Sequence, residues 1–103
     1  MKGYQLIFST LQGRKHPQGK ELSQWLIEEA TTLGIHGATL IHASEGIGRD
    51  GKRHSAHFFE LTDEPIEIIF NVTEDQCHTL FTFLKKENLG LFYTKTAIEF
   101  GTL

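Results

Sequence analysis

Residues 65–76 read PIEIIFNVTEDQ, and this stretch decides the fold. The run from Pro65 to Val72 is rich in β-branched side chains with one aromatic, a composition that favours a β-strand. Thr73 and Gln76 form a capping-box pattern, in which the threonine hydroxyl accepts from the backbone N–H of Gln76 and the glutamine side chain reaches back to the backbone of Thr73. The stretch therefore predicts a strand that passes directly into a helix.

The residues that follow continue the helix. Four apolar residues recur at the i, i+3, i+4 and i+7 spacing of one helical face, and they are Cys77, Leu80, Phe81 and Leu84. Asn88 and Gly90 are residue types that end helices. Residues 91–100 then predict a last strand.

The first half of the chain repeats this order. Residues 4–10 alternate with a period of two and predict a strand. A period near 3.6 begins at Lys20 and predicts a helix that ends at Gly34. Its apolar face consists of Leu22, Trp25, Leu26, Ala30 and Leu33. Residues 38–44 predict a second strand, which is followed by a long polar loop.

The element order is therefore β-α-β-loop-β-α-β. Right-handed crossovers of this length place both helices on one face of a four-stranded antiparallel sheet. The sequence predicts one α+β domain of ferredoxin-like type over residues 1–103, with a loop at about 49–64. The opposite face of the sheet also receives apolar residues, namely Ile7, Ile41, Ala43 and Ile69. Burial against another subunit would cover them, and tolerated surface isoleucines are the simpler alternative.

Composition excludes several classes of protein. The net charge of −3 gives no overall attraction to nucleic acid. No apolar stretch approaches the roughly 20 residues of a membrane-spanning helix, and the first residues do not resemble a secretion signal. A single cysteine, Cys77, is consistent with a reducing compartment. We therefore expect a cytoplasmic protein that neither binds nucleic acid nor inserts into a membrane.

A glycine pair followed by cations is the strongest candidate for a ligand site. Glycines allow backbone N–H groups to approach an anion, and the cations add charge-assisted hydrogen bonds. The residues concerned are Gly46, Gly48, Arg49, Lys52, Arg53 and His54. The alternative interpretation is a strand-to-loop turn with a solvated basic tip.

Other groups of residues give weaker evidence for a functional site. His54 and His57, with Glu60, have a metal-ligand spacing on a helix but point to opposite faces of an extended strand. Cys77 lies on the apolar helix face and is expected in the core. The basic cluster at residues 14–16 is expected to be solvated. No nucleophile, base and acid occur at a catalytic spacing, so an enzyme is not expected.

Four segments carry a resemblance to a known family. They are GKEL at 19–22, GATLIHASEGIG at 37–48, HSAHFFEL at 54–61 and PIEI at 65–68. In order and spacing they resemble the "GKPLYEA", "GATV…GxxGFG", "IHTA…L" and "LPVVIE" segments of the uncharacterised PII-like family. The resemblance covers essentially the whole chain and implies a trimeric fold shared with PII signalling proteins and CutA proteins.

The resemblance also implies a function. In PII proteins the long loop is the regulatory arm, which here corresponds to residues 49–64, and it engages a target protein such as a membrane transporter or an enzyme. Nucleotides bind between subunits at the base of that loop, near a glycine pair that matches Gly46 and Gly48. The PII phosphate-binding segment "TGxxGDGKI" is reduced here to NLGLFYTK, which keeps Gly90 and Lys95. The loop lacks the tyrosine that PII proteins can have uridylylated.

The prediction is therefore a non-enzymatic regulatory protein that forms a homotrimer. It binds a small anionic ligand or an adenine nucleotide, held as an effector and not as a resident cofactor, at the subunit interface. Lys95 is added to the candidate ligand-binding residues because of the family segment. Two alternatives stay open: a ligand-independent trimeric interaction module, and divalent metal binding of the CutA kind.

Overall fold

The computed structural model describes residues 1–47, 53–55 and 64–103. The elements follow one another as β1 (Lys2–Leu11), α1 (Leu22–Thr32), β2 (Thr39–His42), β3 (Glu45–Ile47), β4 (Arg53–Ser55), β5 (Pro65–Thr73), α2 (Glu74–Glu87) and β6 (Phe92–Glu99). Without the small β3–β4 pair, this is the predicted order of four strands and two helices.

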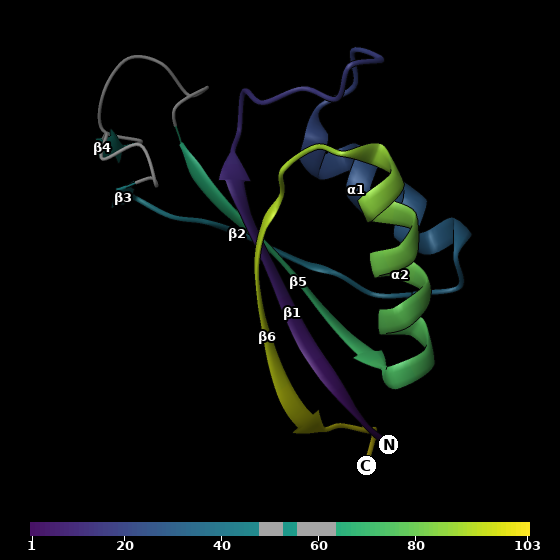
Figure 1. Ribbon diagram of the computed structural model, residues 1–103. Coiled ribbons are helices and arrows are strands. Elements are labelled where there is room, and N and C mark those ends of the chain that lie inside the picture. The colour runs from purple at the N-terminus through teal and green to yellow at the C-terminus, as the bar shows by residue number, and fades with distance from the viewer. Residues whose placement is uncertain (48–52, 56–63) are drawn as a thin grey trace.

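Four of the strands form one antiparallel sheet in the order β2-β5-β1-β6. Both helices lie on the same side of this sheet, and the two ends of the chain lie together at one end of it (Figure 1). The ferredoxin-like arrangement predicted from the sequence is confirmed.

The segment after β2 differs in detail from the prediction. The single strand expected over residues 38–44 is shorter, and the chain then forms a separate antiparallel hairpin from β3 and β4. This hairpin projects beyond the β2 edge of the sheet (Figure 1). Part of the predicted loop therefore forms strand β4, whereas most of the loop lies outside the described residues.

The core lies between the sheet and the helices. Leu6 and Phe8 of β1 are buried together with Phe70 of β5, and the rings of Phe8 and Phe70 meet edge to face at 6.0 Å. The apolar helix faces close over them, with Trp25, Leu26 and Ala30 from α1 and Cys77 and Leu80 from α2. The helical periodicities identified the helix side of this core in advance.

The helix ends also follow the sequence. The backbone N–H of Gln76 donates to Thr73 Oγ1 at 3.2 Å, and the N–H of Thr73 donates to Gln76 Oε1 at 2.9 Å, which completes the predicted capping box. Asn88 closes α2 in the left-handed conformation, with φ of 53°. Gly34 follows α1 with φ of 88°, a value that favours glycine.

In the basic cluster at residues 14–16, only Lys15 is exposed as we expected. His16 is only 4% exposed and stacks on Trp25, with their ring centroids 4.3 Å apart. The Arg14 guanidinium donates to the carbonyl of Leu89, in the turn between α2 and β6. The first loop is thus held to α1 and to the turn between α2 and β6.

Candidate functional site

The β3–β4 hairpin brings predicted ligand residues together. In its register Gly46 lies opposite His54, and Ile47 lies opposite Arg53. Three predicted residues, Gly46, Arg53 and His54, therefore belong to one short two-stranded element. The others in this segment, Gly48, Arg49 and Lys52, lie outside the described residues.

The base of this hairpin is held to the sheet. The N–H of Ala43 donates to the carbonyl of Pro65 at 2.8 Å, and the N–H of Gln12 donates to the carbonyl of Glu64 at 2.9 Å. His42 Nδ1 lies 3.0 Å from Glu64 Oε1, an ion pair when the imidazole is protonated. The two ends of the segment between β2 and β5 are thereby fixed beside each other. Sequence reasoning missed the pair of His42 and Glu64, because it depends on the register of β2 against β5.

Lys95 lies apart from the hairpin within one chain. It belongs to β6, at the edge of the sheet opposite β2, and pairs with Leu6 on the side that faces the helices. Its ammonium lies 4.1 Å from the centroid of the Tyr4 ring and 5.9 Å from that of Phe81. These are cation–π distances, so the aromatic rings hold the charge in place.

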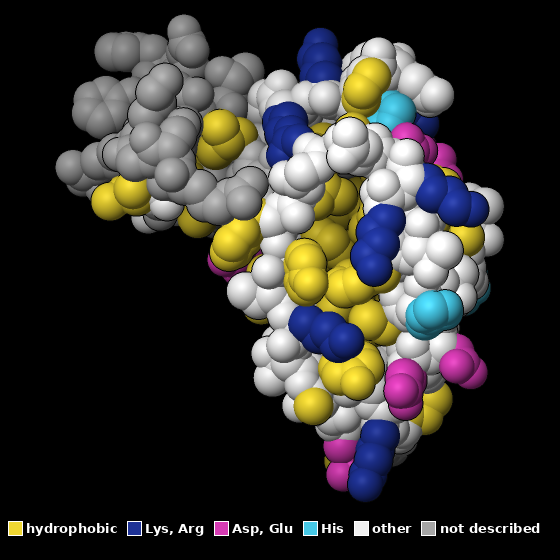
Figure 2. Space-filling model, viewed as in Figure 1, with side chains coloured by type: hydrophobic (Ala, Val, Ile, Leu, Met, Phe, Trp, Pro, Cys, Tyr) yellow, Lys and Arg dark blue, Asp and Glu magenta, His cyan; other side chains and the backbone are white. Residues whose placement is uncertain are grey.

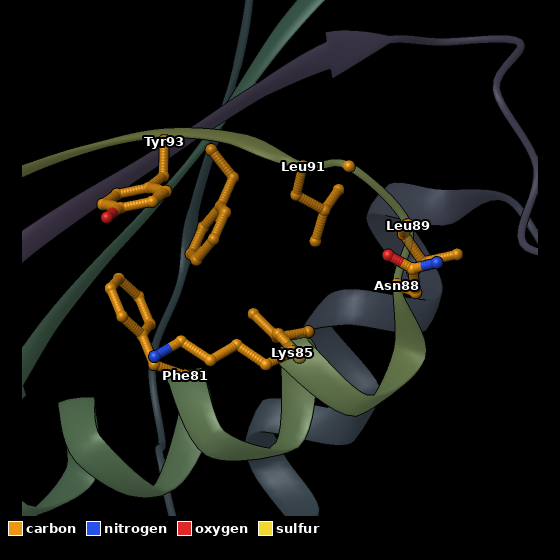
Figure 3. Close-up of a pocket in the computed structure, with 9 residues that line it drawn as sticks. Phe81, Lys85, Asn88, Leu89, Leu91 and Tyr93 are labelled. Atoms are coloured by element: carbon orange, nitrogen blue, oxygen red, sulfur yellow. The ribbon is translucent and has the colours of Figure 1, made fainter.

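A hollow between α2 and β6 is the main feature that sequence reasoning did not find. It has a volume of about 270 Å³ and is lined by Phe8, Phe81, Leu84, Lys85, Asn88, Leu89, Gly90, Leu91 and Tyr93. In Figure 3 the side chains of Leu91 and Tyr93 approach it from one side and those of Phe81 and Lys85 from α2 on the other. Apolar periodicity had predicted several of these residues as core, and it could not reveal that the core is open here.

Metal binding and thiol chemistry find little support in the part of the chain that the structure describes. No group of three His, Cys, Asp or Glu side chains there is arranged to hold a metal ion, while His57 and Glu60 lie outside the described residues. Cys77 is 3% exposed, and burial raises the pKa of its thiol, an effect that the nearby Lys95 partly offsets. The cysteine is a core residue, as predicted.

None of the helices in the described ranges has the length and apolar character that a membrane crossing requires.

The family model described as "DUF190: Uncharacterized ACR, COG1993" matches residues 7–97. A comparison with curated protein sequences gives no match.

Solved structures with the same fold are PII-like signalling proteins. The PII-like signaling protein TTHA0516 from Thermus thermophilus superposes with a TM-score of 0.70 at 15% identity, covering 95% of this chain and 88% of that one. CPII from Thiomonas intermedia, a nitrogen regulatory PII-like protein bound to ADP, AMP and bicarbonate, gives a TM-score of 0.64 at 18% identity, covering 98% and 97%. The apo form of CPII gives 0.51 at 19% identity, covering 95% and 92%. At these identities the likeness establishes a common fold.

Proposed function

We propose a regulatory function for this protein, which belongs to the DUF190 family and has a PII-like fold. It would sense a small anionic ligand or an adenine nucleotide and would not catalyse a reaction. The effector would bind at the interface between subunits of a homotrimer. Its binding would change what the loop at about 49–64 offers to a partner protein. The single unpaired cysteine is consistent with a reducing, cytoplasmic setting.

The observation that carries the proposal is the anchored hairpin. Gly46 has no side chain to block an approaching anion, and it pairs with His54 beside Arg53. A glycine lets the backbone approach an anion, and nearby cations add charge-assisted hydrogen bonds. CPII, which shares the fold, is bound to ADP, AMP and bicarbonate, all of which are anions that such a site suits.

The proposed site contains seven residues, which are Gly46, Gly48, Arg49, Lys52, Arg53, His54 and Lys95. Because β2 and β6 are opposite edges of one sheet, we propose that Lys95 joins the site of an adjacent subunit. A site shared in this way links ligand binding to assembly, and ordering of the loop on binding would transmit the signal to the partner.

A thermal-shift titration tests the proposal. ATP, ADP, AMP and bicarbonate are added singly to the full chain and to an Arg49→Ala variant. A ligand at about 100 times its dissociation constant adds about 2.7 kcal/mol to the native state, which raises the melting temperature measurably. We expect a shift with at least one adenine nucleotide that is lost in Arg49→Ala.

Lys86→Ala is the matched control, because it removes one exposed cation from helix α2. It is expected to keep the full shift. If no nucleotide and no bicarbonate shifts the wild-type transition, the sensor proposal is wrong, and a ligand-independent interaction module becomes the better account. An equal shift in the wild type and in Arg49→Ala removes Arg49 from the site.

A further inference from the structure

The helix layer does not cover the whole sheet. Tyr93 and Ala97 of β6 face the helices in the register with β1, opposite Phe8 and Tyr4. Tyr93 is nevertheless 47% exposed, and Ala97 is also exposed. Figure 2 shows the result as a cleft of apolar side chains between the helix and the edge strand, with Lys and Arg side chains around it.

Three aromatic rings from three elements form the wall of this hollow. Phe8 comes from β1, Phe81 from α2 and Tyr93 from β6. Phe81 and Tyr93 meet edge to face with centroids 4.8 Å apart, and Phe8 lies 6.5 Å from Phe81 and 6.4 Å from Tyr93. Such a cluster suits one further planar ring, because aromatic groups pack edge to face or in offset stacks at these separations.

The charge at the hollow has one sign. Lys85 is among the nine lining residues, and none of the nine carries a carboxylate. Figure 3 shows the Lys85 side chain extended from α2 toward Phe81. The ammonium of Lys95 adds a second positive charge, 5.9 Å from the Phe81 centroid. A ligand with an apolar body and a negative end therefore matches the hollow better than a neutral or cationic one.

From this combination we propose that the hollow between α2 and β6 binds a small aromatic carboxylate. Its ring lies against Phe8, Phe81 and Tyr93, and its carboxylate accepts from the ammonium of Lys85. The volume of about 270 Å³ is below the roughly 300–1,000 Å³ usual for drug-sized ligands, so one ring with a short acidic arm fills it. The site lies on the helix side of the sheet and shares no lining residue with the β3–β4 hairpin, while Lys95, which we assigned to the effector site of an adjacent subunit, lies beside it.

Phenylacetate is the probe, and amide NMR of the full chain is the measurement. The ring and the charge of phenylacetate are tested separately. Benzyl alcohol keeps the ring without the charge, and acetate keeps the charge without the ring. We expect phenylacetate to shift signals of the lining residues with a dissociation constant of order 1 mM, as for other ligands of this size. Benzyl alcohol and acetate are expected to bind at least several-fold more weakly.

Two variants on the same helix turn test the role of the cation. Lys85→Gln removes a charge-assisted hydrogen bond, so phenylacetate should bind about tenfold more weakly, close to benzyl alcohol. Lys86→Gln removes the adjacent charge and should leave the affinity unchanged, because Lys86 does not line the hollow. Both positions are exposed, so neither variant is expected to unfold.

Three results would overturn the proposal. One is the absence of any shift at roughly 20 mM phenylacetate, about twenty times the expected constant. Another is equal affinity for phenylacetate and benzyl alcohol, which would leave no role for the charge. The third is a shift confined to the β3–β4 hairpin, which would place the acid in the proposed effector site. Nucleotide binding is measured independently, so failure of one proposal is separable from failure of the other.

Discussion

At the scale of single residues, Gly3 has a strict steric requirement. It pairs with Thr73 of β5 on one side and with Ile98 of β6 on the other, at the end of the sheet where α2 begins. A Cβ atom built on Gly3 would lie 1.9 Å from the carbonyl oxygen of Val72. No flexible side chain is available to move there, because the obstructing atoms belong to the backbone of a buried strand. Only glycine allows β1 and β5 to approach each other this closely.

Gly3→Ala is therefore expected to destabilise the protein. Overpacking of this kind costs about 1–3 kcal/mol, and separation of β1 from β5 would also disturb the cap of α2. Urea unfolding followed by circular dichroism measures the change. Gly101→Ala is the control, because a Cβ there meets no atom within 4 Å. Equal midpoints for Gly3→Ala and the wild type would show that the strands separate at no cost.

Among the elements, the two helices begin in different ways. Helix α2 starts with a complete capping box and has Glu74 and Asp75 in its first turn, where acidic groups complement the helix dipole. The N-cap residue of helix α1 is Glu21, whose side chain makes no capping hydrogen bond. The start of α1 depends instead on the first loop, where the N–H of Leu22 donates to the carbonyl of Arg14 at 2.9 Å. Local sequence thus fixes α2, whereas tertiary contacts fix α1.

Removing the cap of α2 tests this assignment. Thr73→Ala loses the hydroxyl that accepts from Gln76 and is expected to cost about 1 kcal/mol. Thr82→Ala is the matched control, because Thr82 is exposed within the same helix and alanine has the higher helix propensity. The expected order of urea midpoints is Thr82→Ala at or slightly above the wild type, and Thr73→Ala below it. The reverse order would contradict the assignment.

The same distinction explains how much the sequence predicted. The four strands of the main sheet, the two helices, the capping box and the apolar helix faces follow from neighbours within one or two turns and were predicted, whereas β3 and β4 were not. The remaining features depend on register between distant segments. His54 lies opposite Gly46 only because β3 pairs with β4, and Arg14 reaches Leu89 across 75 residues. The hollow required three aromatic rings from separate elements together with an edge strand left uncovered, which no local pattern encodes.

At the scale of the whole molecule, the face of the sheet opposite the helices carries apolar side chains that are only partly buried or exposed. Ile7 and Ile69 are direct partners there, and each is only partly buried. Ile41 of β2 lies on the same face, opposite Glu67, and is 42% exposed. Burial of apolar area gains about 25 cal/mol per Å², so a second sheet packed here stabilises both subunits. This face is the natural contact for the homotrimer that we propose.

A carboxylate on this face should prevent the assembly. Ile69→Glu places a charge where sheets would meet, and an unpaired buried charge costs several kcal/mol. Sedimentation equilibrium is expected to give three chain masses for the wild type and one for the variant. His78→Glu is the control, because it adds the same group to an exposed position of helix α2 and should leave the trimer intact.

Loss of assembly in Ile69→Glu must be distinguished from loss of folding, because Ile69 is already partly buried within one chain. Ile41→Glu serves this purpose, since Ile41 is 42% exposed and lies near the edge of the sheet. A monomer with native circular dichroism in either variant assigns the interface to this face. A wild-type monomer would disprove the trimer, and trimers in both variants would move the interface elsewhere. A wild-type monomer would also rule out the shared effector site, because Lys95 and the β3–β4 hairpin would then never meet.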